Sequence, residues 1–257
     1  MKKNHFYISY FGNKRTEVKI IYDHLNFDNI TTIIEPFCGT CAISYYISTL
    51  HPKKYRYILN DNNTYLKDIY DIIKNNKCDE FETTINNMIN NINNKTEYTE
   101  IIKPKNIYCW FIKNYIYSIR PGLFPLDFNI NKKKQIKFSD HLIYNFFINE
   151  DIIFTTENGL DCYLKYKDDI QNMIIFDPPY LNTCNDFYKE SKVNVYEYFF
   201  NNNIKNEKAK IYLILENSWV IKLLFNKEKY NTEEYGKNYT SPSKKKTTHI
   251  IINNYIN

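Results

Sequence analysis

The sequence is poor in glycine and has no long apolar run. Glycine accounts for 5 of the 257 residues, which excludes collagen-like and glycine-rich disordered chains. No stretch reaches the roughly 18 consecutive apolar residues that a membrane span requires, so we expect no integral membrane protein. The basic first segment is not followed by an apolar run and small residues, which argues against a secretory signal.

The cysteines do not form a metal-binding pattern. Of the 6 cysteines, Cys38 and Cys41 alone form a Cys-x-x-Cys pair. A second pair at metal spacing and a nearby histidine cluster are both missing, so we expect no structural zinc or other metal. Scattered cysteines in a chain without an export signal indicate reduced thiols and an intracellular location.

The composition is that of a globular protein with a mild positive charge. Hydrophobic residues make up 43% of the chain and charged residues 25%. This length suits one large α/β domain with an insertion, or two small domains. The net charge of +5 permits a polyanion as partner without establishing one.

Short apolar runs alternate with amphipathic segments along most of the chain. Val18, Ile21, Tyr22 and Leu25 show the i, i+3, i+4, i+7 spacing of a helix, and the same spacing recurs over 43–50 and 66–73. Continuous apolar runs indicate central strands that are buried on both faces. The alternation favours a mostly parallel sheet with helices on both sides. Strands are expected at 32–34, 56–59, 152–155, 173–176, 211–215 and 249–253.

The interval 76–149 breaks this alternation. It begins with a polar, helix-like stretch over 79–94, continues with the tyrosine-rich run 108–117, and then becomes basic and rich in turn residues. We interpret it as an insertion into a domain formed by 1–75 and 150–257. The alternative is a helical cap without a partner.

The segment most indicative of chemistry is Asp177-Pro178-Pro179-Tyr180, which follows an apolar strand. In open α/β sheets, ligands bind outside the carboxyl ends of the strands. The two prolines stiffen the turn and remove two N–H donors, so the turn presents acceptors, the Asp177 carboxylate and the Pro178 carbonyl. Acceptors beside an aromatic ring suit a planar heterocycle with an exocyclic amino group. The alternative is an ordinary turn with a surface aspartate.

Two further strand ends suggest a nucleotide site. Glu35-Pro36-Phe37-Cys38-Gly39 leads from a strand into a glycine turn and a helix near Ala42, which allows a ligand to approach the backbone closely. Asp61 ends the next strand, about twenty residues on, where nucleotide-binding folds place an acid against ribose hydroxyls. Asp61 could instead, or also, cap the helix that runs through Ile73.

These segments resemble, in the same order, the motifs of the Dam-like, alpha-type adenine-specific DNA methyltransferases, which use S-adenosylmethionine. The resemblance extends over almost the whole chain. It begins at Tyr10-Phe11-Gly12-Asn13-Lys14-Arg15, includes Glu35–Gly39, Asn60-Asp61 and Asp177–Tyr180, and continues at Leu215–Ser218 and Thr248–Tyr255. It implies an α/β fold with a Rossmann-like, seven-stranded methyltransferase sheet, and a mainly helical target-recognition region at 76–149.

The resemblance also implies roles for individual residues. Asp177, Pro178, Pro179 and Tyr180 would be catalytic, with methyl transfer to the N6 amino group of a flipped adenine in a short DNA site. Cofactor contacts would come from Tyr10, Gly12, Lys14, Glu35, Pro36, Phe37, Gly39, Asp61, Asn158 and Asp177. DNA contacts would come from Arg120, Lys132, Lys133, Lys134, Lys244, Lys245 and Lys246. By themselves, Lys14 could be a solvated surface lysine and the lysine runs solvated faces.

The sequence departs from the family pattern at two positions. Cys41 stands where the family usually has a second glycine, and Asn158 stands where relatives tend to carry an acid near the cofactor adenine. A catalytically inactive nucleic-acid-binding relative is therefore an alternative hypothesis. An RNA adenine methyltransferase is a further alternative. An adenine methyltransferase would work wherever its DNA is, in the cytoplasm for a bacterium or a cytoplasmic virus, as a monomer or a weak dimer.

Overall fold

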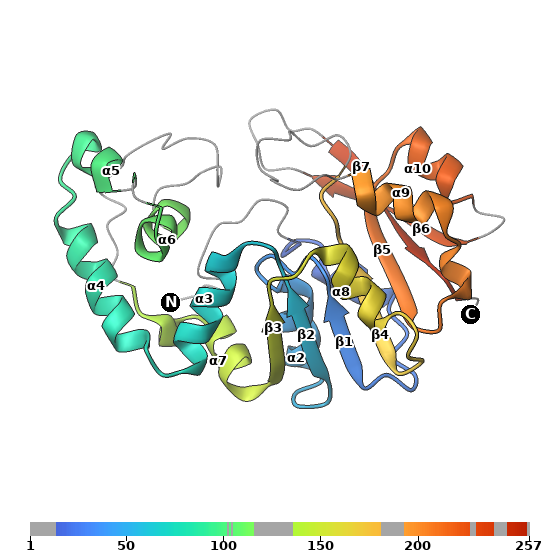
Figure 1. Ribbon diagram of the computed structural model, residues 1–257, viewed down its shortest axis with the longest axis horizontal. Helices are drawn as coiled ribbons and strands as arrows, with labels where there is room; N and C mark the ends of the chain where they lie inside the picture. The colour runs from blue at the N-terminus through green and yellow to red at the C-terminus, as the bar shows by residue number, and fades with distance from the viewer. Residues whose placement is uncertain are drawn as a thin grey trace. The chain divides into compact units, whose positions relative to one another are not determined.

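A computed structural model describes residues 14–101, 103, 105–115, 136–180, 193–226, 230–238 and 246–255. It divides into two compact units, one formed by Lys14–Asn62 with Asp151–Asn257 and the other containing Asn63–Glu150. The first unit holds a seven-stranded sheet, in the order β3-β2-β1-β4-β5-β7-β6 (Figure 1). The second is helical. The sheet and its helices confirm the α/β class predicted from the sequence.

The five strands on one side of the sheet are parallel, and the last two are antiparallel to their neighbours. All five residues of β4 are buried, as expected of a strand covered on both faces. The strands are β1 Thr32–Glu35, β2 Arg56–Asn60, β3 Asp151–Thr155, β4 Asn172–Phe176, β5 Lys210–Glu216, β6 Asn231–Asn238 and β7 Lys246–Asn253.

Helices cover both faces of this sheet. Figure 1 shows α8, α9 and α10 on the near face and α2 on the far face. Alternate strand residues such as Ile34, Ile174 and Leu213 point into one core with Tyr163 of α8 and Phe199 of α9. The helices of this unit are α1 Val18–Asp23, α2 Ala42–Leu50, α8 Gly159–Tyr166, α9 Val193–Asn201 and α10 Trp219–Leu224, with a 3₁₀ turn, η4, at Ile204–Asn206.

The helical unit has an aromatic core of its own. The ring of Phe111 packs edge to face against Phe81 and Phe138, at centroid distances of 5.4 and 5.7 Å. Its elements are α3 Thr64–Lys74, α4 Cys78–Asn90, α5 Lys95–Ile101, α6 Ile107–Tyr115, the 3₁₀ turn η2 Phe138–Asp140 and α7 Leu142–Asn149. The unit contains α3, which the sequence analysis assigned to the catalytic domain. Target recognition by 76–149 stays a prediction.

Two sequence interpretations differ from the structure. Asp61 does not cap the helix through Ile73, because α3 begins later and Asn63 is its N-cap, accepting a hydrogen bond from the Tyr65 backbone N–H at 3.2 Å. The strand β6 was not predicted. Its sequence is polar, and it pairs through its backbone with β7 at the end of the sheet, where no apolar alternation is needed.

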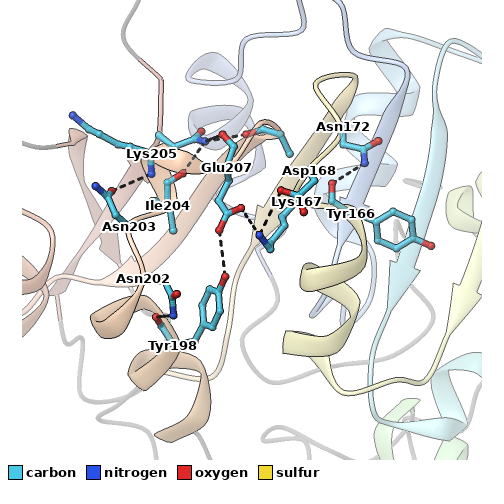
Figure 2. A network of polar contacts seen from close by, with 12 residues as sticks. Tyr166, Lys167, Asp168, Asn172, Tyr198, Asn202, Asn203, Ile204, Lys205 and Glu207 are labelled. Carbon is cyan, nitrogen blue, oxygen red and sulfur yellow. Dashed lines mark hydrogen bonds and ion pairs between the residues drawn. The ribbon is translucent and has the colours of Figure 1, made fainter.

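A polar network ties together the connections before β4 and β5 (Figure 2). Lys167 Nζ lies 2.6 Å from Glu207 Oε2, and Tyr198 donates to Glu207 Oε1 at 3.2 Å. Asn172 Nδ2 donates to the Tyr166 carbonyl at 2.8 Å. Because these residues precede the strands, the network lies at the amino-terminal edge of the sheet and stabilises the fold away from the ligand edge.

Within the described ranges, no helix is both long and apolar enough to cross a bilayer. The same residues contain no group of three or more histidine, cysteine or acidic side chains that could hold a metal ion. Cys38, Cys41, Cys78, Cys109 and Cys162 are buried free thiols.

Candidate active site

The sheet topology brings the predicted motifs to one edge. From β1 the chain runs outward through β2 and β3, then returns to β4 on the other side of β1 and continues to β5. The strand order therefore reverses between β1 and β4, where open α/β sheets bind their ligands. The turns after Glu35 and after Phe176 flank this switch point.

Asp177 is held between two side chains. Lys14 Nζ lies 2.5 Å from its Oδ2, and the Tyr180 hydroxyl donates to its Oδ1 at 3.1 Å. The Lys14 ammonium also lies 5.1 Å from the centre of the Tyr180 ring. The side chains of Lys14 and Asp177 are 4% and 15% exposed, so neither is the solvated surface residue of the alternative interpretations.

The environment of Asp177 has two opposing effects on the pKa of its carboxyl group. Burial raises the pKa of Asp177 above its ordinary value, and the Lys14 ammonium lowers it. Burial also raises the pKa of the Tyr180 hydroxyl well above 10.0, so this group is a hydrogen-bond donor at neutral pH. Lys14 thus favours the charged form of Asp177, and Lys14 and Tyr180 together fix the orientation of the carboxylate.

The two prolines differ in the use of their carbonyl groups. Tyr196 of α9 donates its hydroxyl to the Pro179 carbonyl at 3.3 Å, which fixes the turn to the helix. Pro178 is buried next to Asp177. The Pro178 carbonyl is the acceptor that the sequence analysis assigned to the substrate.

The turn after β1 has a backbone that suits glycine. Gly39 has φ 49°, and Cys41 has φ 58°, both in the left-handed region. The Gly39 N–H donates to Asp61 Oδ2 at 2.9 Å, so the acid after β2 supports the glycine turn directly. Cys41 is 1% exposed, and its Sγ lies 3.9 Å from the Gly39 carbonyl oxygen, so the thiol is buried beside the glycine turn.

Asn60 joins three strand ends, a role that its place in the Asn-Asp motif does not reveal. Its Nδ2 donates to the carbonyls of Pro36 and Glu157 at 2.9 and 3.1 Å. Its Oδ1 accepts from Thr155 Oγ1 and from the Glu157 N–H, at 2.7 and 2.8 Å. The side chain is fully buried and satisfied, so it fixes the turns after β1 and β3 relative to β2.

Glu35 is buried beneath the turn after β1. Its Oε1 accepts from the Ser44 backbone N–H at 2.8 Å and from the Ser44 hydroxyl. Burial raises the pKa of Glu35 from 4.5 to about 7, although the bonds from Ser44 lower it. Glu35 therefore titrates near neutral pH in the folded chain.

The titration of Glu35 predicts a pH-dependent stability. Between pH 4.5 and about 7, the folded chain keeps a proton on Glu35 that the unfolded chain has lost, so folding binds protons. The free energy of unfolding should fall as pH rises through this window, by about 3 kcal/mol in total for this group. Glu35→Gln keeps an acceptor for Ser44 but cannot titrate. Urea unfolding at several pH values should show a flatter profile for this variant, and parallel profiles would contradict the assignment.

Phe37 occupies the space that Gly159 leaves. Its ring packs edge to face on Phe176 at 5.0 Å between centroids. A Cβ placed on Gly159, at the start of α8, would lie 2.2 Å from Phe37 Cζ. The glycine therefore allows the motif of β1 to pack against the helix after β3, which the sequence analysis did not recognise.

Gly159→Ala should displace Phe37 and weaken cofactor binding. Forcing a methyl group into this contact costs about 1–3 kcal/mol, equivalent to roughly a 5- to 160-fold loss of affinity if the turn carries the cofactor. Calorimetry with S-adenosylmethionine would measure the change. Gly236→Ala is the matched control, because a Cβ there meets nothing within 4 Å. Equal affinities for the two variants would remove Phe37 from the cofactor site.

Asn158 is the N-cap of α8. Its side-chain oxygen accepts from the Leu160 N–H at 2.8 Å, a local role that the sequence analysis did not assign. The predicted contact of Asn158 with the cofactor adenine stays a prediction.

Several predicted site residues lie outside the described part of the chain. Lys246 begins β7, and its side chain is not described. The predicted site residues that lie wholly outside the described ranges are Tyr10, Gly12, Arg120, Lys132, Lys133, Lys134, Lys244 and Lys245. Their predicted cofactor and DNA contacts stay predictions.

Comparisons with known proteins identify the family of the chain. A model of the D12 class N6 adenine-specific DNA methyltransferases matches residues 10–197. The type II methyltransferase M.CviBI of Paramecium bursaria Chlorella virus NC1A is 26% identical over 270 residues, covering 96% of this chain and 98% of that protein. A crystal structure of the N-terminal domain of human METTL16 in complex with SAH aligns with 94% of this chain and 68% of its own, at a TM-score of 0.37 and 7% identity.

Proposed function

Because the chain belongs to the D12 class of N6 adenine-specific DNA methyltransferases, we propose that it transfers a methyl group from S-adenosylmethionine to the N6 amino group of adenine at a short, specific DNA site. The observation that carries the proposal is the position of Asp177, a carboxylate held by Lys14 and Tyr180 at the switch point of the sheet. An enzyme of this kind would work wherever its target DNA is.

The chain's own residues would act by positioning. The lone pair of an adenine amino nitrogen is delocalised into the ring, which makes it a poor nucleophile. Hydrogen bonds from this amino group to Asp177 and to the Pro178 carbonyl would favour a pyramidal nitrogen with its lone pair directed at the methyl group. Holding two reactants in line in this way can contribute roughly 7–11 kcal/mol.

Asp177 can serve the substrate without losing its own partners. A carboxylate has about four lone-pair sites, and Lys14 and Tyr180 use one on each oxygen. The Tyr180 ring is 8% exposed, so stacking of a flipped base on it requires the ring to be uncovered as the base enters.

The residues of the β1 turn fit S-adenosylmethionine, which when bound supplies an electrophilic methyl group on a sulfonium. The left-handed Gly39 allows a close approach to the backbone, and Asp61 is an acid at the end of the neighbouring strand. Cys41 adopts the left-handed backbone conformation that glycine favours, with its side chain buried. This turn would bind the cofactor, and Asp61 would hold its ribose.

A transfer assay tests the proposal. The purified chain would be incubated with tritiated S-adenosylmethionine and unmethylated duplex DNA, single-stranded DNA or RNA. We expect label in DNA, recovered as N6-methyladenine, and sequencing of the modified bases would give the site. Label in RNA alone would overturn the DNA assignment. DNA binding without heat on adding the cofactor in calorimetry would instead identify an inactive relative.

A further inference from the structure

Three buried polar side chains that the proposed mechanism does not use form a cluster beside Tyr180. They are Glu17 at the N-terminus of α1, Tyr235 on β6 and His249 on β7, with exposed fractions of 2%, 8% and 0%. His249 Nδ1 lies 2.8 Å from Glu17 Oε2, and the Tyr235 hydroxyl donates to the same oxygen at 3.0 Å. Tyr235 and His249 are cross-strand partners, so the sheet register itself brings them together.

The cluster contacts the catalytic residues at two points. The rings of His249 and Tyr180 meet edge to face, with centroids 5.2 Å apart and an interplanar angle of 77°. The Glu17 N–H donates to the Lys14 carbonyl at 2.7 Å. One tight turn therefore carries both the ammonium that binds Asp177 and the carboxylate that binds His249.

Stability alone is a weak reason for such a cluster. Burying a carboxylate costs several kcal/mol, and well-packed apolar side chains are often equally or more stabilising. His249 Nε2 is also buried without a hydrogen-bond partner among the described residues, which adds to that cost. What the hydrogen bonds of such a network do supply is a single, fixed arrangement of the groups that make them. Here the cluster contacts the ring of Tyr180 and the turn of Lys14, and so restricts the positions of both. These are the two groups that bind the two oxygens of Asp177.

We propose, on the basis of the methyl transfer proposed above, that Glu17, Tyr235 and His249 are positioning residues for that reaction. Their contacts set the Tyr180 ring so that its hydroxyl reaches Asp177 Oδ1, and they set the turn from which Lys14 reaches Oδ2. The carboxylate is thereby oriented before the substrate enters.

His249→Asn is the direct test. Asparagine keeps a side-chain N–H near the position of Nδ1 but removes the ring that contacts Tyr180. The single-turnover rate of methyl transfer at saturating cofactor and DNA should fall roughly 10–100-fold, because a small misplacement of reacting groups has effects of this size. The dissociation constant of the cofactor should be unchanged. Tyr235→Phe, which removes only one hydroxyl, should change the rate in the same direction by a smaller factor.

The matched control is His51→Asn. His51 also pairs with a tyrosine, since its Nε2 lies 2.8 Å from the Tyr22 hydroxyl, and its ring stacks on Tyr22 with centroids 5.9 Å apart. It is the C-cap of α2, at the opposite end of that helix from the glycine turn. Its replacement should lower the free energy of unfolding without lowering the transfer rate of the folded protein.

A double-mutant cycle separates positioning from a purely structural role. In a Tyr180→Phe background, where the hydroxyl that His249 orients is absent, His249→Asn should have much less effect on the rate than in the wild type. Equal effects in the two backgrounds would overturn the inference, as would a wild-type rate in both His249→Asn and Tyr235→Phe. In those cases the wild-type chain still methylates adenine and the proposed function stands. A wild-type chain that labels no DNA overturns the proposed function and the inference together.

Discussion

Replacing Asp177 with alanine should abolish methyl transfer while leaving the affinity for S-adenosylmethionine within several-fold of its original value. The carboxylate is the acceptor that we assign to the substrate amino group, at the end of β4. Removing one preorganised polar contact to a reacting group lowers kcat by about 10²–10³. Transfer of tritium to DNA would give the rate, and calorimetry the cofactor affinity. A wild-type rate in this variant would reject the role of Asp177.

The alanine variant needs a control, because it leaves Lys14 buried without its counter-charge. Breaking a buried pair on one side typically costs 3–5 kcal/mol, so inactivity could reflect unfolding. Asp177→Asn keeps an oxygen for Lys14 and the shape of the side chain, but loses the negative charge. The double variant Lys14→Met/Asp177→Ala removes both charges together. If all three variants are inactive, and the double variant, which leaves no unpaired buried charge, keeps a urea unfolding curve close to that of the wild type, the loss belongs to the chemistry.

Replacing Lys14 with methionine should shift the acid side of the pH–rate profile to higher pH. Lys14 lowers the pKa of Asp177, which burial raises, so removing the ammonium lets the pKa rise further. A protonated Asp177 is a weaker acceptor for the amino group, so the rate increases with pH as the carboxyl group ionises. On the acid side of the profile we expect a lower kcat than that of the wild type at the same pH, because a larger fraction of Asp177 is protonated. The loss should be partly recovered at alkaline pH.

Lys14→Arg is the matched control for charge. Arginine keeps a cation near Asp177, so its profile should stay close to that of the wild type on the pH axis, even if the different shape lowers the maximal rate. Measuring kcat from pH 5 to 9 for the two variants separates charge from geometry. Superimposable profiles for Lys14→Met and the wild type would show that Lys14 does not control the ionisation of Asp177.

The central strands and the catalytic turn could be predicted from local sequence. Runs such as Met173–Phe176 are apolar without interruption because both faces of the strand are buried. This pattern does not depend on which strands lie next to it. The turn Asp177–Tyr180 follows such a strand directly, so its place at the ligand edge depends only on the strand being parallel. The helix of 66–73 was visible for the same local reason, its spacing of apolar residues.

Contacts between distant segments were not predictable in this way. Asn60 was one half of a short motif, and its four hydrogen bonds depend on turns 24 and 97 residues away. Gly159 leaves the space that the Phe37 ring occupies. The two residues meet because α8 packs over the sheet next to the turn after β1. The polar strand β6 gave no signal, since an edge strand is held by its backbone.

The sequence alone determined the class of fold, the order of the motifs and the residue types at the ligand edge, because each is encoded within a few neighbouring residues. Tertiary structure decided which partners those residues have. It placed Lys14 on Asp177, and it brought Glu17 to Tyr235 across 218 residues. The physical reason is that an ion pair or a ring contact depends on distance in space, and the strand order of the sheet sets that distance.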